Sequence, residues 1–408
     1  MLSRGPLTGL RVLDLSRILA GPYATMMLGD MGADVIKVER PIVGDDTRTW
    51  GPPFTKKGHE SAYFISVNRN KRSIAIDMKQ RRGLDLIKSL ASRSDIVIDN
   101  FAPGDGEKLG LFRDKFLSEF PSLIWCSISG YGRDGPLSHR LGYAVLLEAH
   151  SGLMNCTGPR DGDPVKAGVA MTDILTGLHA CSGILAALHE RSKTGKGTLI
   201  DCSLLESQVS AMTNVASNWL IGNQESQRLG TDHPSIVPYG TMKTKDGRIA
   251  IAAGNDAQFS GLCRCLGIPM NDMYKTNTDR VRNRDSCMTL LESVTITRTT
   301  SEWLECFEKV VDGKFAFAPV YNMEKVFSDP QVLHRGMLIE CEHKTAGNIR
   351  MPGTPIKFPL HDQKKPARLP PPVLGEHTVE ILRDFLGLDE AIVRELINDK
   401  VVYSDVAV

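Results

Sequence analysis

Short apolar runs alternate with helical patterns between residues 11 and 128, and this alternation constrains the fold more than any other feature of the chain. The runs predict strands at Arg11–Leu15, Ala33–Val38, Ser73–Asp77, Asp95–Asp99 and Leu123–Ile128. Helices are predicted from Gly21 to a stop at Gly32, at Gly83–Ala91 and at Phe112–Glu119. Strands separated by helices favour an α/β fold with a doubly wound parallel sheet.

Ligands of such sheets bind beyond the carboxyl ends of the strands, so the residues that follow each strand form a candidate site. These residues are Arg17, Leu19, Ala20, Glu39, Arg40, Lys79, Asn100, Phe101 and Ser129–Tyr131. The connecting loops add the cations Arg48, Arg69, Lys71, Arg72, Lys108, Arg133 and Arg140. Several of them could converge on one phosphorylated ligand, and the alternative is a solvated rim of charges.

Glu39 ends the second predicted strand, as does the ribose-binding acid of nicotinamide enzymes. The first turn, Ser16–Pro22, lacks the G-x-G-x-x-G pattern of that fold. The sequence therefore disfavours a dehydrogenase.

The stretch Gly168–Asp173 precedes an apolar run that extends to Leu188. Asp173 stands where a helix is predicted to begin, and its carboxylate could accept the free N–H groups of the first turn. The helix is predicted to end near Gly195, before a strand at Thr198–Cys202. On local sequence alone, Asp173 is either a helix cap or a residue that faces an anionic ligand.

The charge balance excludes some classes of partner. With 49 basic and 48 acidic residues among 408, the chain has no global field for nucleic acid, so we expect a small anionic ligand.

The nine cysteines are scattered, and Cys263-x-Cys265 lacks the spacing of a metal or redox site, so we expect reduced thiols and no metal. We also expect no membrane contact, because no apolar run approaches the roughly 20 residues of a span. The start, Met1–Pro6, resembles neither a signal peptide nor a transit segment, so we expect a mature or truncated chain.

After Cys202 the alternation of strand and helix patterns stops, which predicts a second domain. Leu204–Gly222 is predicted as one helix, and Arg228–Tyr239 as a loop. A hairpin at Gly240–Ala253 and helices at Asp256–Leu266 and Ser301–Val311 are predicted to follow. The remaining predictions are a return at Pro319–Met323, a proline-rich strap at Lys365–Pro372 and two helical segments from Gly375 to Lys400.

Several motifs together resemble the class III CoA-transferase family, which includes formyl-CoA transferase and carnitine CoA-transferase. They are Val12–Pro22, Gly32–Glu39, Asn68–Ser73, Thr194–Gly197 and Leu374–His377, and the similarity spans nearly the whole chain. Gly44–Phe54 and Gly168–Asp173 are most similar to the mitochondrial branch that moves CoA between succinate and glutarate.

The resemblance implies a Rossmann-like large domain built from both ends of the chain, a smaller α+β domain, and a homodimer of interlocked rings. Residues 1–203 would form the N-terminal part of the large CoA-binding domain, 204–228 a linker helix, 229–318 the small domain, and 319–408 the return segment and the rest of the large domain. The resemblance further implies a mitochondrial location. It also implies that the partners are acyl-CoA and small carboxylic acids. Coenzyme A would be part of the substrate, with no tightly bound cofactor.

The resemblance assigns the nucleophile of the family to Asp173. The CoA-contacting positions fall on Leu19, Ala20, Arg40, Lys79, Asn100, Phe101, Lys108 and Tyr143. Two positions depart from formyl-CoA transferase. The glycine-rich lid aligns with Leu229–Pro234, which keeps Gly230 and adds His233, and a CoA-binding lysine aligns with Leu141, which leaves Arg140 as its substitute.

The implied mechanism is covalent. Asp173 would attack the acyl-CoA thioester to form an acyl-aspartyl anhydride, CoA would form an aspartyl thioester, and the acceptor would take CoA through a second anhydride. We expect Asp173 to stay ionised at neutral pH because it lies at a helix N-terminus.

Three alternatives remain at this point. One is an acyl-CoA racemase of the same fold, although the histidine of that family falls on Tyr143, and a phenol is a poor base. The others are a CoA-transferase for another carboxylic acid and a CoA-binding protein without catalysis.

Overall fold

The computed structural model describes residues 5–359 and 368–404, and the chain forms two compact units. The first unit comprises Met1–Leu153, Ala167–Ser217 and Pro330–Val408, and the second comprises Met154–Lys166 and Asn218–Asp329. These extents differ from the expected boundaries, because residues 154–166 join the second unit. The N–H of Gly230 donates to the carbonyl of Gly158, and Arg228 donates to the carbonyl of Gly162, so this segment is tied to the loop that follows α10 (Thr213–Gly222).

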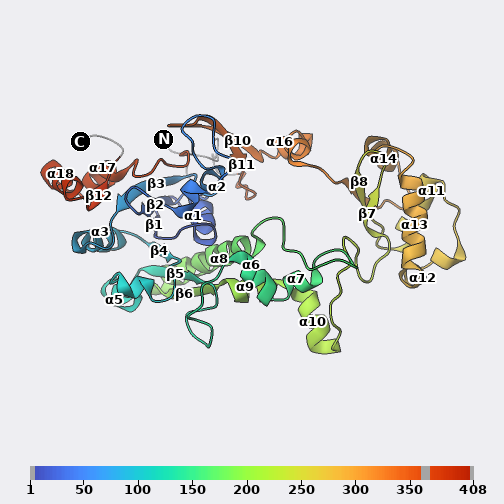
Figure 1. Cartoon of the computed structure of the whole chain (residues 1–408), viewed down its shortest axis with the longest axis horizontal. Helices are drawn as coiled ribbons and strands as arrows, with labels where there is room; N and C mark the ends of the chain where they lie inside the picture. Colours follow the sequence, from blue (N-terminus) through green and yellow to red (C-terminus); the bar gives the residue numbers. More distant parts are fainter. Residues whose placement is uncertain (1–4, 360–367, 405–408) are drawn as a thin grey trace. The chain divides into compact units, whose positions relative to one another are not determined.

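In the described residues, the first unit is built on a seven-stranded sheet in the order β12-β3-β2-β1-β4-β5-β6 (Figure 1). The strands are β1 (Arg11–Asp14), β2 (Asp34–Glu39), β3 (Lys71–Ile76), β4 (Ile96–Asp99), β5 (Ile124–Ser129), β6 (Leu199–Ser203) and β12 (Val402–Tyr403). Neighbours pair in parallel, except that β12 is antiparallel to β3. This sheet confirms the predicted α/β fold.

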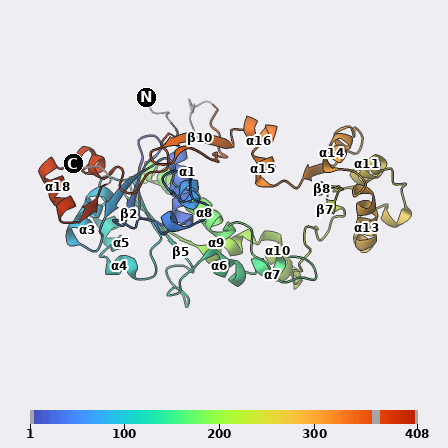
Figure 2. The same cartoon turned by 45° about the horizontal axis from the view of Figure 1, so that its top comes forward.

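Helices cover both faces of the sheet, because successive residues of a buried strand point to opposite sides. Leu13 packs on one face with residues of the last helices, including Ile381. Val12 packs on the other face with α1 (Ala20–Asp30) and α8 (Met171–Thr194). Figure 2 shows α1 and α8 on one side of the sheet and α3 and α18 on the other.

The remaining elements of the first unit are mostly short. They are α2 (Ala62–Ser66), α3 (Arg81–Ala91), α4 (Asp105–Lys108), α5 (Arg113–Glu119), α6 (Ala144–His150), α7 (Leu153–Cys156, which continues into the second unit), α9 (Leu204–Ala211), α16 (Pro330–His334), the hairpin β10 (Leu338–His343) and β11 (Gly347–Pro352), α17 (Thr378–Glu380), a π-helical turn (Ile381–Phe385) and α18 (Glu390–Asn398). A 3-10 turn spans Asp46–Thr49.

Two expectations about helices were wrong. The single helix predicted at Leu204–Gly222 is divided into α9 and α10, and Thr213 at the break has φ of 38°. Helix α8 is long and apolar enough, by length and composition, to cross a membrane, although no such run was expected. Its buried residues include Ala180 and Ile184, which pack in the core beside α1, as in the core helix of a folded domain.

The second unit contains the antiparallel sheet β7 (Tyr239–Lys243), β8 (Arg248–Ala252) and β9 (Ala316–Pro319). Its helices are α11 (Asp256–Leu266), α12 (Asn277–Arg282), α13 (Arg284–Thr295), α14 (Thr300–Glu308) and α15 (Met323–Val326), with a 3-10 turn at Asp272–Tyr274. The predicted hairpin and α11 are confirmed. Asn255 caps α11 by accepting from the N–H of Gln258, and Phe259 and Trp303 lie in the core.

The first three residues of the predicted strap, 365–367, lie outside the described residues. The rest of the strap lies beside the start of β3. The N–H groups of Arg368 and Leu369 both donate to Oδ1 of Asn70, the residue before that strand.

Candidate active site

A pocket of about 160 Å³ lies at the carboxyl ends of β1, β4 and β5, which are neighbours in the sheet. It is lined by residues that follow these strands and by residues of the loop before α6, together with Asp173. The lining residues are Arg17, Ile18, Leu19, Ala20, Asn100, Phe101, Ala102, Pro103, Ile128, Ser129, Gly130, Arg140, Leu141, Gly142, Tyr143, Asp173 and Leu204. The structure thus brings together Asp173 and six predicted CoA contacts, Leu19, Ala20, Asn100, Phe101, Arg140 and Tyr143.

Asn100 connects the loops that follow β1 and β4. The N–H of Arg17 donates to Oδ1 of Asn100 at 2.9 Å, and Nδ2 of Asn100 donates to the carbonyl of Arg17 at 2.7 Å. These reciprocal bonds hold two walls of the pocket against each other.

Asp173 lies in the first turn of α8 but does not cap it. The helix begins at Met171, and the preceding residue, Ala170, has no side chain that can accept a hydrogen bond. Burial raises the pKa of Asp173 to about 6, and the charge of Glu148 adds to this rise. The helix N-terminus was expected to favour the ionised form, but burial shifts the pKa in the opposite direction, although it still lies below 7.

Two groups that interact with Asp173 were not predicted from the sequence. Glu148 on α6 is buried and accepts from the N–H of Ala167 at 3.0 Å. The pKa of Tyr63 on α2 is raised above its ordinary value, mainly by burial and further by the charges of Asp173 and Asp45. No local pattern distinguished either residue, since each is far from Asp173 in the sequence.

The first turn of α8 is fixed by a buried hydrogen bond. Oγ1 of Thr172 donates to Oε1 of Gln208 on α9 at 2.8 Å, and both residues are buried. This bond sets the rotation of the helix, and hence the direction of the neighbouring Asp173.

Three of the predicted CoA contacts do not line this pocket. Arg40 pairs with Asp46 at 2.6 Å, and Asp46 also pairs with Arg17 of the lining at 2.7 Å. Lys108 is exposed and pairs with Asp105 at 2.9 Å, and Lys79 is exposed in the turn after β3.

Four of the loop cations, which were candidates either for ligand binding or for a solvated rim, are instead engaged in ion pairs of the fold. Arg48 pairs with Glu39, Arg69 with Asp30, Lys71 with Asp14, and Arg72 with Asp34 and Glu380. Glu39 is also buried, and it accepts from Ser73 and from the N–H of Asp45. Its carboxylate is therefore occupied within the protein and does not resemble a ribose-binding acid.

The predicted lid residues, Gly230 and His233, belong to the second unit. Nδ1 of His233 accepts from the N–H of Ser235 at 3.1 Å, and its ring lies 5.2 Å from that of Tyr239. The backbone of Gly230 has φ of 59°, which glycine adopts readily. His233 thus braces its own turn, which leaves Nε2 as the ring nitrogen for any further contact.

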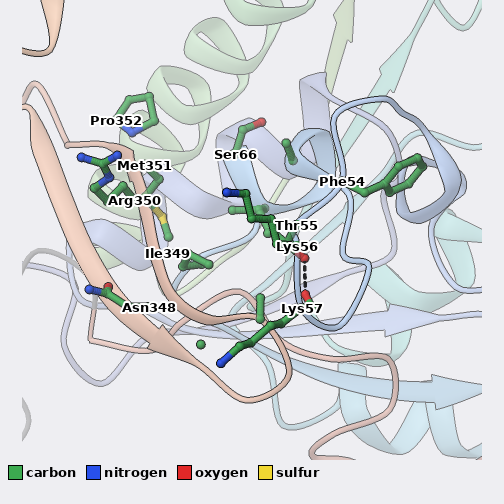
Figure 3. A pocket seen from close by; sticks show the side chains of 14 residues that line it. Phe54, Thr55, Lys56, Lys57, Ser66, Asn348, Ile349, Arg350, Met351 and Pro352 are labelled. Carbon is green, nitrogen blue, oxygen red and sulfur yellow. Dashed lines mark hydrogen bonds between the residues drawn. The ribbon is translucent and has the colours of Figure 1, made fainter. Parts of the chain in front are cut away.

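A second pocket of about 690 Å³ lies between the loop before α2 and strand β11 (Figure 3). Lys56, Lys57 and Arg350 line it, and Figure 3 shows that their terminal nitrogens do not converge. Among the described residues of its lining there is no carboxylate, histidine or cysteine. This lining therefore offers no carboxylate nucleophile comparable to Asp173.

Within residues 5–359 and 368–404, no group of three or more His, Cys, Asp or Glu side chains is arranged to hold a metal ion. None of the nine cysteines, all of which lie in these residues, forms a disulfide bond.

Comparison with known proteins agrees with this geometry. The sequence profile of CoA-transferase family III matches residues 7–378. Human succinyl-CoA:glutarate CoA-transferase is 49% identical over 97% of this chain and 90% of the relative. Succinate–glutarate CoA-transferase of Agrobacterium fabrum is 40% identical over 93% of this chain and 95% of the relative. A crystal structure of a CAIB/BAIF family protein from Brucella suis superposes with a TM-score of 0.83 at 39% identity, covering 94% of this chain and all of the other. The chain therefore belongs to CoA-transferase family III.

Proposed function

We propose that this CoA-transferase moves CoA from succinyl-CoA to a dicarboxylic acid such as glutarate, with Asp173 as the covalent nucleophile. The observation that carries the proposal is that Asp173 is the one acid among the described residues of the pocket lining. The named activities of the human and Agrobacterium relatives support the choice of substrates.

The exchange needs no oxidant and no energy source. A carboxylate oxygen of Asp173 attacks the thioester carbonyl, and the C–S bond breaks. CoA leaves as a thiolate, and an acyl-aspartyl anhydride remains. The thiolate attacks the aspartyl carbonyl and releases succinate. The acceptor carboxylate then displaces CoA to form a second anhydride, and attack of CoA on the acceptor carbonyl releases Asp173 unchanged.

The environment of Asp173 suits this role. A pKa of about 6 leaves the carboxylate ionised at neutral pH and makes it more basic than an exposed aspartate. Arg140 supplies a positive charge in the same pocket, where it would favour a polyanionic ligand. Leu19, Ala20, Asn100, Phe101 and Tyr143 would contact CoA from the other walls.

A racemase of the same fold is the second candidate, and the pocket argues against it. Racemisation needs two proton-transferring groups on opposite sides of a carbon. No histidine occurs among the described lining residues, and Tyr143 stands where a racemase histidine is expected.

Several further properties belong to the same proposal. Arg40, Lys79 and Lys108 would contact more distant phosphates of CoA, and Gly230 and His233 would close the site. The chain would act as an interlocked homodimer in mitochondria, with no tightly bound cofactor.

The test is to incubate the enzyme with succinyl-CoA and a panel of carboxylic acids, and to identify the new thioesters by mass spectrometry. A quenched reaction should carry CoA on the peptide that contains Asp173. Asp173→Ala should abolish both signals while it still binds CoA. Near-normal turnover by Asp173→Ala would show that the mechanism is wrong, and absence of glutaryl-CoA would reject the proposed acceptor.

A further inference from the structure

The loop that connects β1 to α1 contains a strained residue. Ile18 has φ of 71°, in the left-handed region that a β-branched side chain rarely adopts. Ile18 lines the pocket of Asp173 together with its neighbours Arg17, Leu19 and Ala20. A strained backbone persists only where the surroundings hold it, and such strain clusters at functional sites.

A buried ion pair holds this loop from behind. The N–H of Ile18 donates to the carboxylate of Asp45, with both oxygens at 3.2 Å. Nζ of Lys37 donates to Oδ2 of Asp45 and to the carbonyl of Ser16, each at 2.9 Å. The side chains of Lys37 and Asp45 are both fully buried, so the pair fixes the backbone on each side of Arg17.

Asp45 is organised to stay charged in this position. Burial alone would raise its pKa, but Lys37 and the hydrogen bonds from Thr47 outweigh burial and lower the pKa to about 2. A buried ion pair contributes little net stability compared with apolar side chains of similar volume. The ion pair of Lys37 and Asp45 is therefore explained better by the conformation that it imposes on the loop than by a gain in stability.

We propose that Asp45, together with Lys37, is a positioning residue for CoA binding, which acts by holding Ile18 in the left-handed conformation. The proposal rests on the proposed function, because it takes the pocket of Asp173 to be the CoA site. The held turn directs Leu19 and Ala20, at the start of α1, toward the pocket. The first N–H groups of a helix have no partner within it and suit an anionic ligand. Neither Asp45 nor Lys37 lines the pocket itself.

The test combines a variant, a matched control and a rescue. Asp45→Asn weakens the hold on Ile18. Asp30→Asn is the control, because the side chain of Asp30 is also nearly buried (3% exposed), pairs with Arg69 at 2.6 Å in the same unit and does not touch the loop. Ile18→Gly is the rescue background, because glycine adopts positive φ without being held. The readouts are the Kd of CoA by calorimetry, the separate values of kcat and KM, and Tm.

We expect Asp45→Asn to weaken CoA binding about tenfold, the size of a modest conformational penalty, and to raise KM more than it changes kcat. Asp30→Asn should lower Tm by about as much as Asp45→Asn does, but it should leave CoA binding unchanged. In the Ile18→Gly background, Asp45→Asn should weaken binding by less than about threefold, because the loop no longer needs the carboxylate. If Asp45→Asn does not fold, Lys37→Met/Asp45→Leu replaces the pair with apolar side chains and should show the same loss and rescue.

Equal effects of Asp45→Asn and Asp30→Asn on CoA binding would overturn the inference. So would an undiminished tenfold loss in the Ile18→Gly background. In both cases wild-type binding of CoA would leave the proposed function standing. Failure of the wild-type enzyme to bind CoA would instead reject the proposed site and this inference together.

Discussion

The buried carboxylate of Glu148 on α6 raises the pKa of Asp173 on α8, in addition to the larger effect of burial. The two acids are far apart in the sequence, and the fold brings their charges close enough to interact. A second acid therefore makes Asp173, the proposed nucleophile, more basic, and the pH dependence of the reaction should depend on both.

Glu148→Gln should lower the pKa of Asp173, because it removes a like charge while an amide oxygen can still accept from Ala167. Asp173 reacts when ionised, so kcat/KM of the wild type should fall as the pH drops through about 6. In Glu148→Gln this fall should move to lower pH. The pH–rate profiles of both enzymes measure the shift. Glu190→Gln, on the exposed face of α8, is the control and should leave the profile unchanged; an identical profile for Glu148→Gln would refute the coupling.

Asp173→Asn should make the folded protein more stable at neutral pH while it abolishes transfer. Because the folded-state pKa is raised from 3.8 to about 6, ionisation of Asp173 opposes folding at pH 7. Removing the charge should increase the free energy of unfolding by about 2–3 kcal/mol. The gain should shrink as the pH falls through 6 and vanish below about 4, where both side chains are neutral. Urea unfolding at pH 7.5 and pH 4 tests this, and an equal gain at both values would contradict it.

Gly177→Ala should disturb the start of α1. An added Cβ would lie 2.7 Å from the carbonyl oxygen of Ala20, so the backbone of one helix must move. We expect a loss of about 1–3 kcal/mol in stability and a higher KM for acyl-CoA, because Ala20 lines the pocket. Gly183→Ala in the same helix is the control, since its Cβ would meet only the side chain of Ile200. That variant should stay within about 1 kcal/mol of the wild type, and similar losses in both variants would indicate a general effect on α8.

Arg140→Ala should raise the KM for acyl-CoA more than Lys79→Ala does. Arg140 lines the pocket of Asp173, whereas Lys79 does not. Loss of one charge-assisted contact of about 1.5 kcal/mol corresponds to roughly a tenfold rise in KM. Steady-state kinetics with succinyl-CoA measure both variants. A larger effect of Lys79→Ala would show that Arg140 is not the main cationic contact of CoA.

His233→Ala should lower kcat/KM for glutarate more than for a monocarboxylate acceptor, by about 1–3 kcal/mol, if Nε2 donates to the distal carboxylate. His233→Asn is the matched variant, because its side chain can still accept from Ser235 and brace the turn. Both variants should lose the preference for glutarate. Recovery of that preference in His233→Asn, or equal losses for both acceptors, would show that His233 only shapes the loop.

Local pattern was sufficient for most of the elements. The apolar runs of β1, β2, β4 and β5 were predicted because buried parallel strands are continuously apolar, and α11 was predicted to the residue. Asp173 was predicted to lie at the start of a helix, which the structure confirms, and its proposed role rests on the resemblance of its motif to the family.

Tertiary structure decided which charges serve the fold and which face the pocket. Arg48, Arg69, Lys71 and Arg72 were candidates either for ligand binding or for a solvated rim, but each pairs with a carboxylate brought by another segment. Similar side chains in loops are indistinguishable until their partners are known, because an ion pair depends on distance and burial and not on sequence spacing.

The sequence by itself therefore determined most of the order of strands and helices and the parallel sheet, since these depend on periodicity and on neighbouring residues. Only the tertiary structure decided that Glu148 raises the pKa of Asp173, that β12 closes the sheet against β3, and that Asp45 holds Ile18. Each of these joins segments whose separation along the chain carries no local signal. Their energies arise from burial and close contact, which exist only once the chain has folded.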